Sequence, residues 1–284
     1  CSATKIHRGG NCKGIGSLLS APTMWTTWRP EVPESSDGEA LVTTVSQLFQ
    51  SFPYHRLPSD PFTSVWLRPK IVAGLLIFYV ISKAPLKALC NAIGFDSKSR
   101  IFTAAIALHN LVLAVFSAIV AWNAWRVVIE HYLNHGFLAA YCDYDRTLWH
   151  NGLGAWTTIF YISKFYEFVD TWILVLKGKH ASFLQVYHHT GIAFIMWMGV
   201  ASQSTWLSVV VLLNSVIHTF MYTYFLIKTI SPKTEIKAAK HLTMAQIAQF
   251  VTGIAISSGV FFLGDECASE SSRFGLACLH VYGY

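Results

Sequence analysis

The sequence predicts an all-α, polytopic membrane helix bundle. Hydrophobic residues make up 53% of the 284 positions and charged residues only 13%, about half the charged share of a soluble globular domain. Aromatic residues reach 14%, which suits a membrane protein whose Trp and Tyr rings lie at headgroup level. Several apolar runs also approach the roughly 20 residues that a spanning helix needs. Membrane lipids are therefore the expected surroundings of the chain.

Two regions differ in composition. Residues 1–60 contain glycine-rich and P-E-V-P-E-S-S-D-G-E segments with one brief apolar stretch, so we expect a flexible or extramembranous segment. Residues 61–284 alternate apolar runs with short polar loops and form the predicted transmembrane domain. Six spans are predicted there, at residues 66–84, 101–125, 154–176, 181–200, 204–227 and 241–264.

A seventh helix is predicted to be cut short. The apolar run 274–284 has only eleven residues, little more than half a span. We therefore expect a chain that is truncated at its C-terminus and lacks a basic tail. Residue 1 is Cys instead of Met, which leaves the true start of the chain open as well.

Loop charge predicts the orientation of the bundle, because cytoplasmic loops collect Lys and Arg. The first, third and fifth loops are rich in Lys, whereas the second and sixth carry Arg146 and Arg273, respectively, beside Asp and Glu, and the fourth carries no charge. The odd loops are therefore expected to be cytoplasmic. Cys142 and Cys267 then both face an oxidising compartment, which predicts a disulfide between them and leaves the other Cys residues free. The net charge of +6 forms no continuous stripe, so nucleic acid is not an expected partner.

Ionisable and polar side chains recur inside four of the predicted spans. Each is costly in hydrocarbon, so each is a functional candidate, although such groups also pair between helices for purely structural reasons. In the third span, three charges at i, i+3 and i+6 share one helical face. The candidates are Lys164, Glu167 and Asp170 in the third span, Gln185, His188 and His189 in the fourth, Asn214, His218, Met221 and Tyr222 in the fifth, and Thr243, Gln246 and Gln249 in the sixth.

Four of these candidates share one depth. Asp170, His188, His218 and Gln249 lie 7, 9, 10 and 9 residues from the nearest cytoplasmic Lys. At about 1.5 Å per residue, all four lie roughly 10 to 15 Å below one membrane face. Structural pairing would scatter polar groups through the bilayer, so a shared buried site that opens to the cytoplasm is the better interpretation.

A di-iron centre is the first alternative for this site. His131 and His135 form an H-x-x-x-H pair, but the predicted orientation places them on the opposite side of the membrane. Gln185 stands where a third His would be needed, and its amide is a poor iron ligand beside imidazole. We therefore expect no metal site. The remaining histidines that we considered are interpreted as interfacial or packing residues: His109, His150, His180 and His241.

Four motifs in order carry a family resemblance: K-F-Y-E-F-V-D-T-W-I-L-V-L-K-G-K, F-L-Q-V-Y-H-H, N-S-V-I-H-T-F-M-Y-T-Y-F and T-M-A-Q-I-A-Q. They resemble the fatty-acid elongase (ELO) family of very-long-chain 3-oxoacyl-CoA synthases. The resemblance implies a multi-pass protein of the endoplasmic reticulum with six helices around an acyl tunnel and one peripheral helix. It also implies condensation of acyl-CoA with malonyl-CoA, without a further cofactor.

Gln185 departs from the H-x-x-H-H box that is usual in this family. The Gln form resembles that of algal, protist and lower-plant elongases that act on polyunsaturated chains. An 18- or 20-carbon polyunsaturated acyl-CoA is therefore the expected substrate. Other enzymes of the elongation cycle and a second copy of the chain are candidate partners.

The predicted chemistry assigns each charged or imidazole group a role. His188 attacks the thioester to form an acyl-imidazole, since a buried imidazole can divide the condensation into two easier steps. His189 orients neighbouring side chains or the thioester oxygen, and His218 binds or deprotonates near the reacting carbons. Glu167 and Asp170 fix imidazole tautomers, and Lys164 holds the malonyl carboxylate.

The basic loops have two interpretations. Lys177 and Lys179, with Lys228 and Lys233, are expected to receive the CoA phosphates, although positive-inside topology alone explains most of them. A transporter or receptor also remains open, because a single buried polar layer in a helix bundle could equally be a carrier's ligand site.

Overall fold

The computed structural model of the chain describes residues 61–236, 239–264 and 267–283, and helix is their only regular secondary structure. The all-α prediction is confirmed for this part of the chain, and the predicted segment 1–60 lies outside it. A short π-helical turn (Trp149–Leu153) precedes α6, and a 3-10 turn (Gly259–Phe261) follows α10. The α-helices are α2 (Pro61–Leu67), α3 (Pro69–Ala92), α4 (Arg100–His135), α5 (Phe137–Cys142), α6 (Gly154–Tyr166), α7 (Phe168–Leu176), α8 (Phe183–Ala201), α9 (Leu207–Ile230), α10 (Ala239–Ser258) and α11 (Glu270–Gly283).

Apolar side chains cover the outside of this bundle. Among the described residues, four helical segments are long and apolar enough to cross a membrane: α3, α4, α9, and α10 with its 3-10 extension. Large hydrophobic side chains such as Ile77, Trp122 and Ile247 are exposed on them. So much exposed apolar surface would be unfavourable in water, whereas lipid accommodates it. The chain is a multi-span membrane protein.

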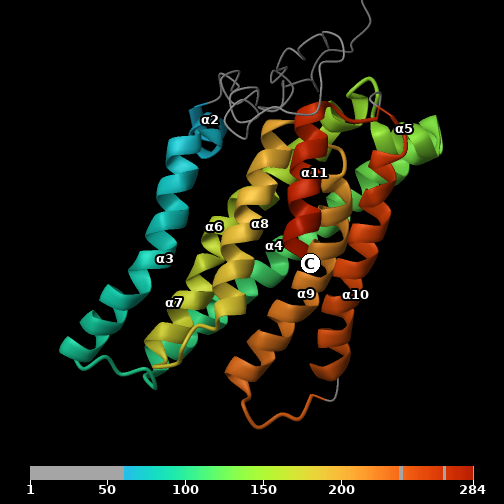
Figure 1. Cartoon of the computed structure of the whole chain (residues 1–284). Coiled ribbons are helices and arrows are strands. Elements are labelled where there is room, and N and C mark those ends of the chain that lie inside the picture. The colour runs from blue at the N-terminus through green and yellow to red at the C-terminus, as the bar shows by residue number, and fades with distance from the viewer. Residues whose placement is uncertain (1–60, 237–238, 265–266, 284) are drawn as a thin grey trace, which may run out of the picture.

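Six of the helices close into a ring. Helix α4 packs on α9, α9 on α10, α10 on α11, α11 on α8, α8 on α6, and α6 returns to α4. Helix α3 packs on α7 and α8 and stands at the edge of the bundle (Figure 1). The structure therefore has the expected arrangement of six helices and one peripheral helix.

Three predicted spans have clearly different bounds in the structure. The first was predicted at residues 66–84, but α2 ends at Leu67 and α3 runs from Pro69 to Ala92. The second was predicted to end at residue 125, but α4 continues to His135. An exposed ion pair between Arg126 and Glu130, at i, i+4, stabilises the additional turns. The third was predicted as one helix, but Glu167 separates α6 from α7. Its ψ of −11° tightens the chain into one 3-10-like turn, with Asp170 N donating to Glu167 O.

The lysine-rich loops gather at one end of the bundle. The connections α3–α4, α7–α8 and α9–α10 lie at the same end, whereas α2, α5 and the α8–α9 turn lie at the other (Figure 1). This is the grouping that loop charge predicted. Cys90 and Cys278 are free, as expected, while Cys1 and Cys12 lie outside the described residues.

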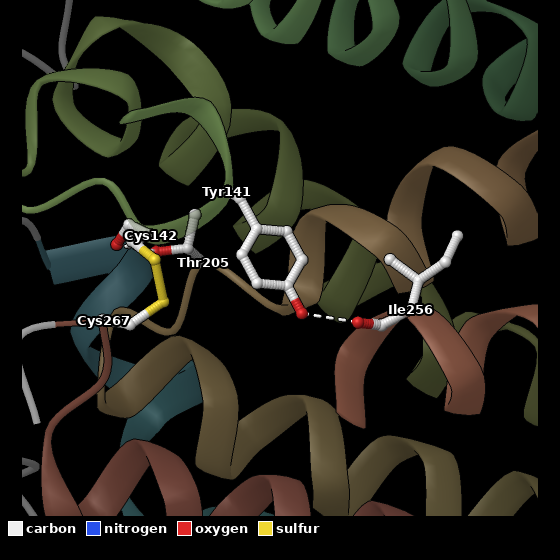
Figure 2. The surroundings of a disulfide bond; sticks show 5 residues. All are labelled: Tyr141, Cys142, Thr205, Ile256 and Cys267. Atoms are coloured by element: carbon white, nitrogen blue, oxygen red, sulfur yellow. Dashed lines mark hydrogen bonds between the residues drawn. A yellow bond between two sulfur atoms is a disulfide. The ribbon is translucent and has the colours of Figure 1, made fainter. Parts of the chain in front are cut away.

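A disulfide joins Cys142 to Cys267 at the end opposite the lysine loops, as the sequence predicted (Figure 2). Thr205 Oγ1 donates to Cys142 O at 3.2 Å, and Tyr141 Oη donates to Ile256 O on α10. The bond and its neighbours therefore connect α5, the α8–α9 turn and the segment between α10 and α11. This connection anchors the start of α11 to the rest of the bundle.

The next residue, Asp143, organises the chain after α5. It lies in the left-handed region with φ of 50°, and its carboxylate accepts hydrogen bonds from Leu148 N and Trp149 N, each at 2.8 Å. Burial raises the pKa of Asp143, while the two backbone donors and nearby Arg146 oppose that shift. Arg146 Nη1 in turn donates to Gln203 O at 2.6 Å, which holds this loop against the α8–α9 turn.

Removal of the disulfide should destabilise the bundle without disrupting its helices. The bond closes a loop of 125 residues in sequence, and native disulfides contribute about 2–5 kcal/mol of stability. The double variant Cys142→Ser/Cys267→Ser should therefore melt about 5–15 °C lower in detergent. Cys90→Ser, which removes a half-buried free thiol, is the matched control and should melt close to the wild type. Equal melting temperatures for all three proteins would contradict a stabilising role.

Candidate active site

One cavity of about 1250 Å³ opens between the helices at the lysine-loop end. The residues that line it come from α4, α7, α8, α9, α10 and α11. Five of the six ring helices therefore contribute, and the sixth, α6, is continued by α7, which also lines the cavity. Most of the side chains singled out from the sequence meet here. The predicted site residues that line the cavity are Glu167, Asp170, Lys177, Gln185, His188, His189, Asn214, His218, Met221, Tyr222, Gln246 and Gln249.

The four residues predicted at one depth belong to this single cavity. Asp170 comes from α7, His188 from α8, His218 from α9 and Gln249 from α10. Their helices are far apart in sequence but adjacent in the ring. The interpretation of the polar layer as one shared site therefore agrees with the structure.

His188 is held by a tyrosine from the last helix. Ser182 caps α8 by accepting a hydrogen bond from Gln185 N, which sets where the helix begins. One turn later, His188 Nδ1 lies 3.0 Å from Tyr282 Oη on α11, and the ring of Phe250 on α10 is 5.9 Å away. No sequence pattern pointed to Tyr282, because its contact with His188 joins residues 94 positions apart.

His189 turns to a different part of the protein. Its ring lies 6.1 Å from that of Tyr79 on α3 and 6.4 Å from that of Phe168 on α7. The side chain is buried, and its Nδ1 has no hydrogen-bond partner among the described residues. Adjacent positions on a helix point about 100° apart, so the two imidazoles have separate environments, as expected.

A buried ion pair lies behind the cavity wall. Lys164 Nζ lies 2.7 Å from Glu167 Oε1 and 3.2 Å from Asn214 Oδ1, and it sits 3.9 Å from the centre of the Phe160 ring. The side chains of Lys164 and Glu167 are 1% and 3% exposed. His218 Nδ1 is 3.6 Å from Glu167 Oε1, close enough for an electrostatic contact but long for a hydrogen bond.

The position of Lys164 corrects its predicted role. The ammonium does not line the cavity, and its charge is already directed to Glu167 and Asn214. It therefore cannot hold a malonyl carboxylate in this arrangement. Its effect on the site is to position Glu167 and Asn214, which do line the cavity.

Asp170 also has a partner that the sequence did not predict. Its Oδ1 lies 2.8 Å from His109 Nε2, and its Oδ2 accepts a hydrogen bond from Tyr222 Oη at 2.7 Å. The other ring nitrogen of His109 is 3.2 Å from Tyr166 Oη. His109 was interpreted as a packing residue, but it fixes the carboxylate of Asp170. Its position inside an apolar span, nine residues from Arg100, was the signal that could have identified it.

Gln185 belongs to a chain of hydrogen bonds that reaches the peripheral helix. Its Nε2 donates to Thr171 Oγ1 at 3.1 Å, and Tyr79 Oη lies 2.7 Å from the same oxygen. The bonds connect α8, α7 and α3. Gln185 thus uses its amide as a hydrogen-bond donor toward α7.

Helix α10 contributes only part of what was predicted. Gln246 Nε2 contacts Met221 Sδ at 3.3 Å, and Gln249 Oε1 is buried without a partner among the described residues. Thr243 is exposed and donates to Ala239 O within its own helix, so its side chain does not reach the cavity. Thr243 is therefore not supported as a substrate-binding residue.

The mouth of the cavity is basic. Lys98, Lys177 and Lys228 line it, and Lys228 Nζ also donates to Pro232 O and Thr234 O in the α9–α10 loop. Partial desolvation, with the neighbouring Lys179 charge, lowers the pKa of Lys177. Lys179 itself is exposed and is not among the residues that line the cavity, so its contact with the CoA phosphates stays a prediction.

His131 and His135 lie at the far end of α4, with ring centres 4.5 Å apart. This placement agrees with their exclusion from the polar layer. Within the described residues, no group of three or more His, Cys, Asp or Glu side chains has an arrangement that could hold a metal ion.

Comparison with known proteins identifies the family. Residues 64–284 match ELO, the GNS1/SUR4 family. The chain belongs to the ELO family. Fatty acid elongase sre1 of Dictyostelium discoideum is 32% identical over 194 residues, which cover 67% of this chain and 69% of that protein. A putative fatty acid elongase of the same organism is 32% identical over 244 residues, covering 84% of this chain and 79% of its own length.

A similar likeness extends to a second organism. Fatty acid elongase 1 of Trypanosoma brucei brucei is 31% identical over 213 residues, covering 74% of this chain and 67% of that protein. The ELO match includes every residue that lines the cavity, from Ser97 to Gly283. The cavity is therefore a feature of the ELO domain of this chain.

The contribution of the buried Lys164–Glu167 pair to the stability of the bundle can be tested. Lys164→Met would leave the Glu167 carboxylate buried without its cation, and loss of one partner of such a pair costs about 3–5 kcal/mol. We expect a marked drop in melting temperature, part of which Lys164→Met/Glu167→Gln should restore. Arg126→Met, which breaks the exposed pair with Glu130, is the control and should cost about 0–1 kcal/mol. If the Lys164 and Arg126 variants lose equal stability, the buried pair stabilises the bundle no more than the exposed pair does.

Proposed function

We propose that this ELO family protein condenses a long-chain acyl-CoA with malonyl-CoA to give 3-oxoacyl-CoA, CO₂ and CoA, the first step of fatty-acid elongation. It is then an acyltransferase, a very-long-chain 3-oxoacyl-CoA synthase. The observation that carries the proposal is a cavity that leads from a basic mouth to a layer of imidazoles inside a membrane bundle. The names of the related proteins support the same reaction class.

The two ends of the cavity suit the two parts of an acyl-CoA. At the mouth, Lys98, Lys177 and Lys228 offer ammonium groups that can pair with phosphates. Deeper in, side chains such as Phe250 and Ile254 provide apolar wall for an acyl chain. The thioester of a bound acyl-CoA would then lie between these regions, near His188.

His188 is the proposed nucleophile. Its imidazole attacks the thioester carbonyl, a carbon–nitrogen bond forms, and the carbon–sulfur bond breaks as CoA leaves as a thiolate that takes a proton from solvent. Malonyl-CoA then loses CO₂, and the resulting carbanion attacks the acyl group on His188. This second step forms the new carbon–carbon bond and regenerates the imidazole. The apolar walls would limit hydrolysis of the acylated histidine by excluding water.

The remaining polar groups have supporting roles in this proposal. His189, whose buried Nδ1 is unpaired among the described residues, is available to hold the thioester oxygen as negative charge develops. His218, close to Glu167, binds or deprotonates near the reacting carbons. The side chains proposed to contact substrate are Gln185, Asn214, Met221, Tyr222, Gln246 and Gln249.

The endoplasmic reticulum membrane is the proposed location. Disulfides form in oxidising compartments such as its lumen, and the Cys142–Cys267 bond lies at the end opposite the lysine loops. The basic mouth would then open to the cytoplasm, where acyl-CoA and malonyl-CoA are soluble. Other elongation-cycle enzymes and a second copy of the chain remain proposed partners.

Transport is the alternative, since a carrier could use the same buried layer as a ligand site. Consumption of malonyl-CoA and appearance of CO₂ in membranes that contain the protein would support the enzyme. Movement of acyl-CoA without either change would support a carrier.

The covalent step can be tested with one substrate. Incubation with acyl-CoA alone should release CoA and add one acyl mass to a peptide that contains His188. His188→Ala should abolish both signals, while His135→Ala, an exposed histidine at the opposite end, should leave them unchanged. Normal condensation by a folded His188→Ala protein would move the nucleophile to His189 or His218.

Substrate preference can be measured separately. Because Gln185 replaces the first box histidine, we expect 18- or 20-carbon polyunsaturated acyl-CoA to be elongated faster than the saturated chains of equal length. Competition between these substrates, followed by fatty-acid profiling, gives the ratio directly. A ratio of one or lower would reject the preference while leaving the reaction itself in place.

A further inference from the structure

Tyr282 makes two hydrogen bonds to one residue of the proposed active site. Its Oη lies 3.0 Å from His188 Nδ1 and 3.0 Å from the main-chain oxygen of the same histidine. Tyr282 lies in α11, whereas His188 lies in α8, and both residues line the cavity. The last described helix therefore reaches the nucleophile directly.

The two hydrogen bonds of Tyr282 determine which ring nitrogen of His188 carries the proton. A carbonyl oxygen can only accept, so the single hydroxyl proton of Tyr282 is donated to His188 O. The tyrosine oxygen must then accept from the ring, which requires the proton of a neutral imidazole to lie on Nδ1. The other ring nitrogen, Nε2, is left with a free lone pair. An imidazole nitrogen with a lone pair is the form that can attack a thioester.

The tyrosine ring is held tightly in the position that these bonds require. A Cβ atom at position 191 would overlap the Tyr282 ring, so Gly191 is the residue that allows α11 to approach α8 so closely. On its other side, the Tyr187 ring stacks at 4.9 Å, and Tyr187 Oη donates to Tyr282 O at 3.2 Å. The position of the Tyr282 ring therefore depends on its packing against Gly191 and Tyr187, and this packing remains when only the hydroxyl is removed.

We propose that Tyr282 is a positioning residue that keeps His188 in the tautomer protonated on Nδ1, with Nε2 as the attacking atom. This inference rests on the proposed function and names the atom that forms the covalent bond. When Nε2 attacks, the acylated ring retains the Nδ1 proton and carries a positive charge, and CoA departs as a thiolate. The Tyr282 oxygen accepts from that proton throughout, which stabilises the charged intermediate. Attack by the malonyl-derived carbanion returns the neutral ring in the same tautomer.

The test compares two hydroxyl deletions in the full chain. Tyr282→Phe keeps the ring against Gly191 and Tyr187 but removes both hydrogen bonds. Tyr141→Phe is the matched control, because it also removes a tyrosine hydroxyl that donates to a helical carbonyl (Figure 2). Tyr141 belongs to α5, at the end of the bundle opposite the lysine loops (Figure 1). We expect acylation of His188 by acyl-CoA alone to slow about five- to twentyfold in Tyr282→Phe, the size expected for loss of one or two ordinary hydrogen bonds. The acyl-CoA concentration at half-maximal rate should stay the same, and Tyr141→Phe should acylate at the wild-type rate.

A spectroscopic measurement separates positioning from a general loss of structure. In protein labelled with ¹⁵N-histidine, the ring resonances that disappear in His188→Gln belong to His188. They should indicate protonation on Nδ1 in the wild type and in Tyr141→Phe, and a shift toward protonation on Nε2 in Tyr282→Phe. A purely structural role for Tyr282 would lower stability without this change of tautomer.

The outcomes distinguish this inference from the function on which it rests. A wild-type protein that forms no His188 adduct overturns the covalent mechanism and the inference together. Normal adduct formation in the wild type, with an equal acylation rate or an unchanged tautomer in Tyr282→Phe, overturns the inference alone. A slower adduct with a shifted tautomer and unchanged acyl-CoA dependence supports it.

Discussion

Hydrocarbon offers no hydrogen-bond partners, and this constraint governs where the polar side chains of the chain lie. The pair Lys164–Glu167 satisfies it most completely, because both charges are buried and the ammonium also reaches Asn214. The pair brings α6 and α9 together at the depth of the imidazoles. Glu167 is also the residue at which α6 gives way to α7, so its backbone ends one helix while its side chain forms part of the cavity wall.

The other polar contacts extend this pattern around the ring. Asp170 receives His109 from α4 and Tyr222 from α9, while Gln185 reaches Thr171 and, through it, Tyr79 on α3. These bonds remove polar groups from lipid, and those of Asp170, Tyr222 and Gln185 at the same time fix side chains that line the cavity. Stability and pre-organisation therefore depend on the same contacts, as is common when a site is built inside a membrane bundle.

Helix α11 has a particular place in this arrangement. It completes the ring between α10 and α8, and its approach to α8 requires the absence of a side chain at Gly191. The Cys142–Cys267 disulfide anchors the segment just before it, at the opposite end from the basic mouth (Figures 1 and 2). A contact that orients His188 is thus supported by a covalent bond at the far end of the same helix.

The sequence alone determined the fold class, the approximate position of the helices, the grouping of the lysine-rich loops at one end of the bundle, the disulfide and the polar layer. These follow from local hydropathy, from loop charge, and from i, i+3 and i+4 spacing, all of which act within one helix or loop. It could not determine that Lys164 turns away from the cavity to meet Asn214, that Asp170 binds His109, or that Tyr282 binds His188. Those pairs join residues 50, 61 and 94 positions apart, and their formation depends on the rotation and vertical register of packed helices. Only tertiary packing sets these two quantities, because each helix alone presents the same side chains at any rotation.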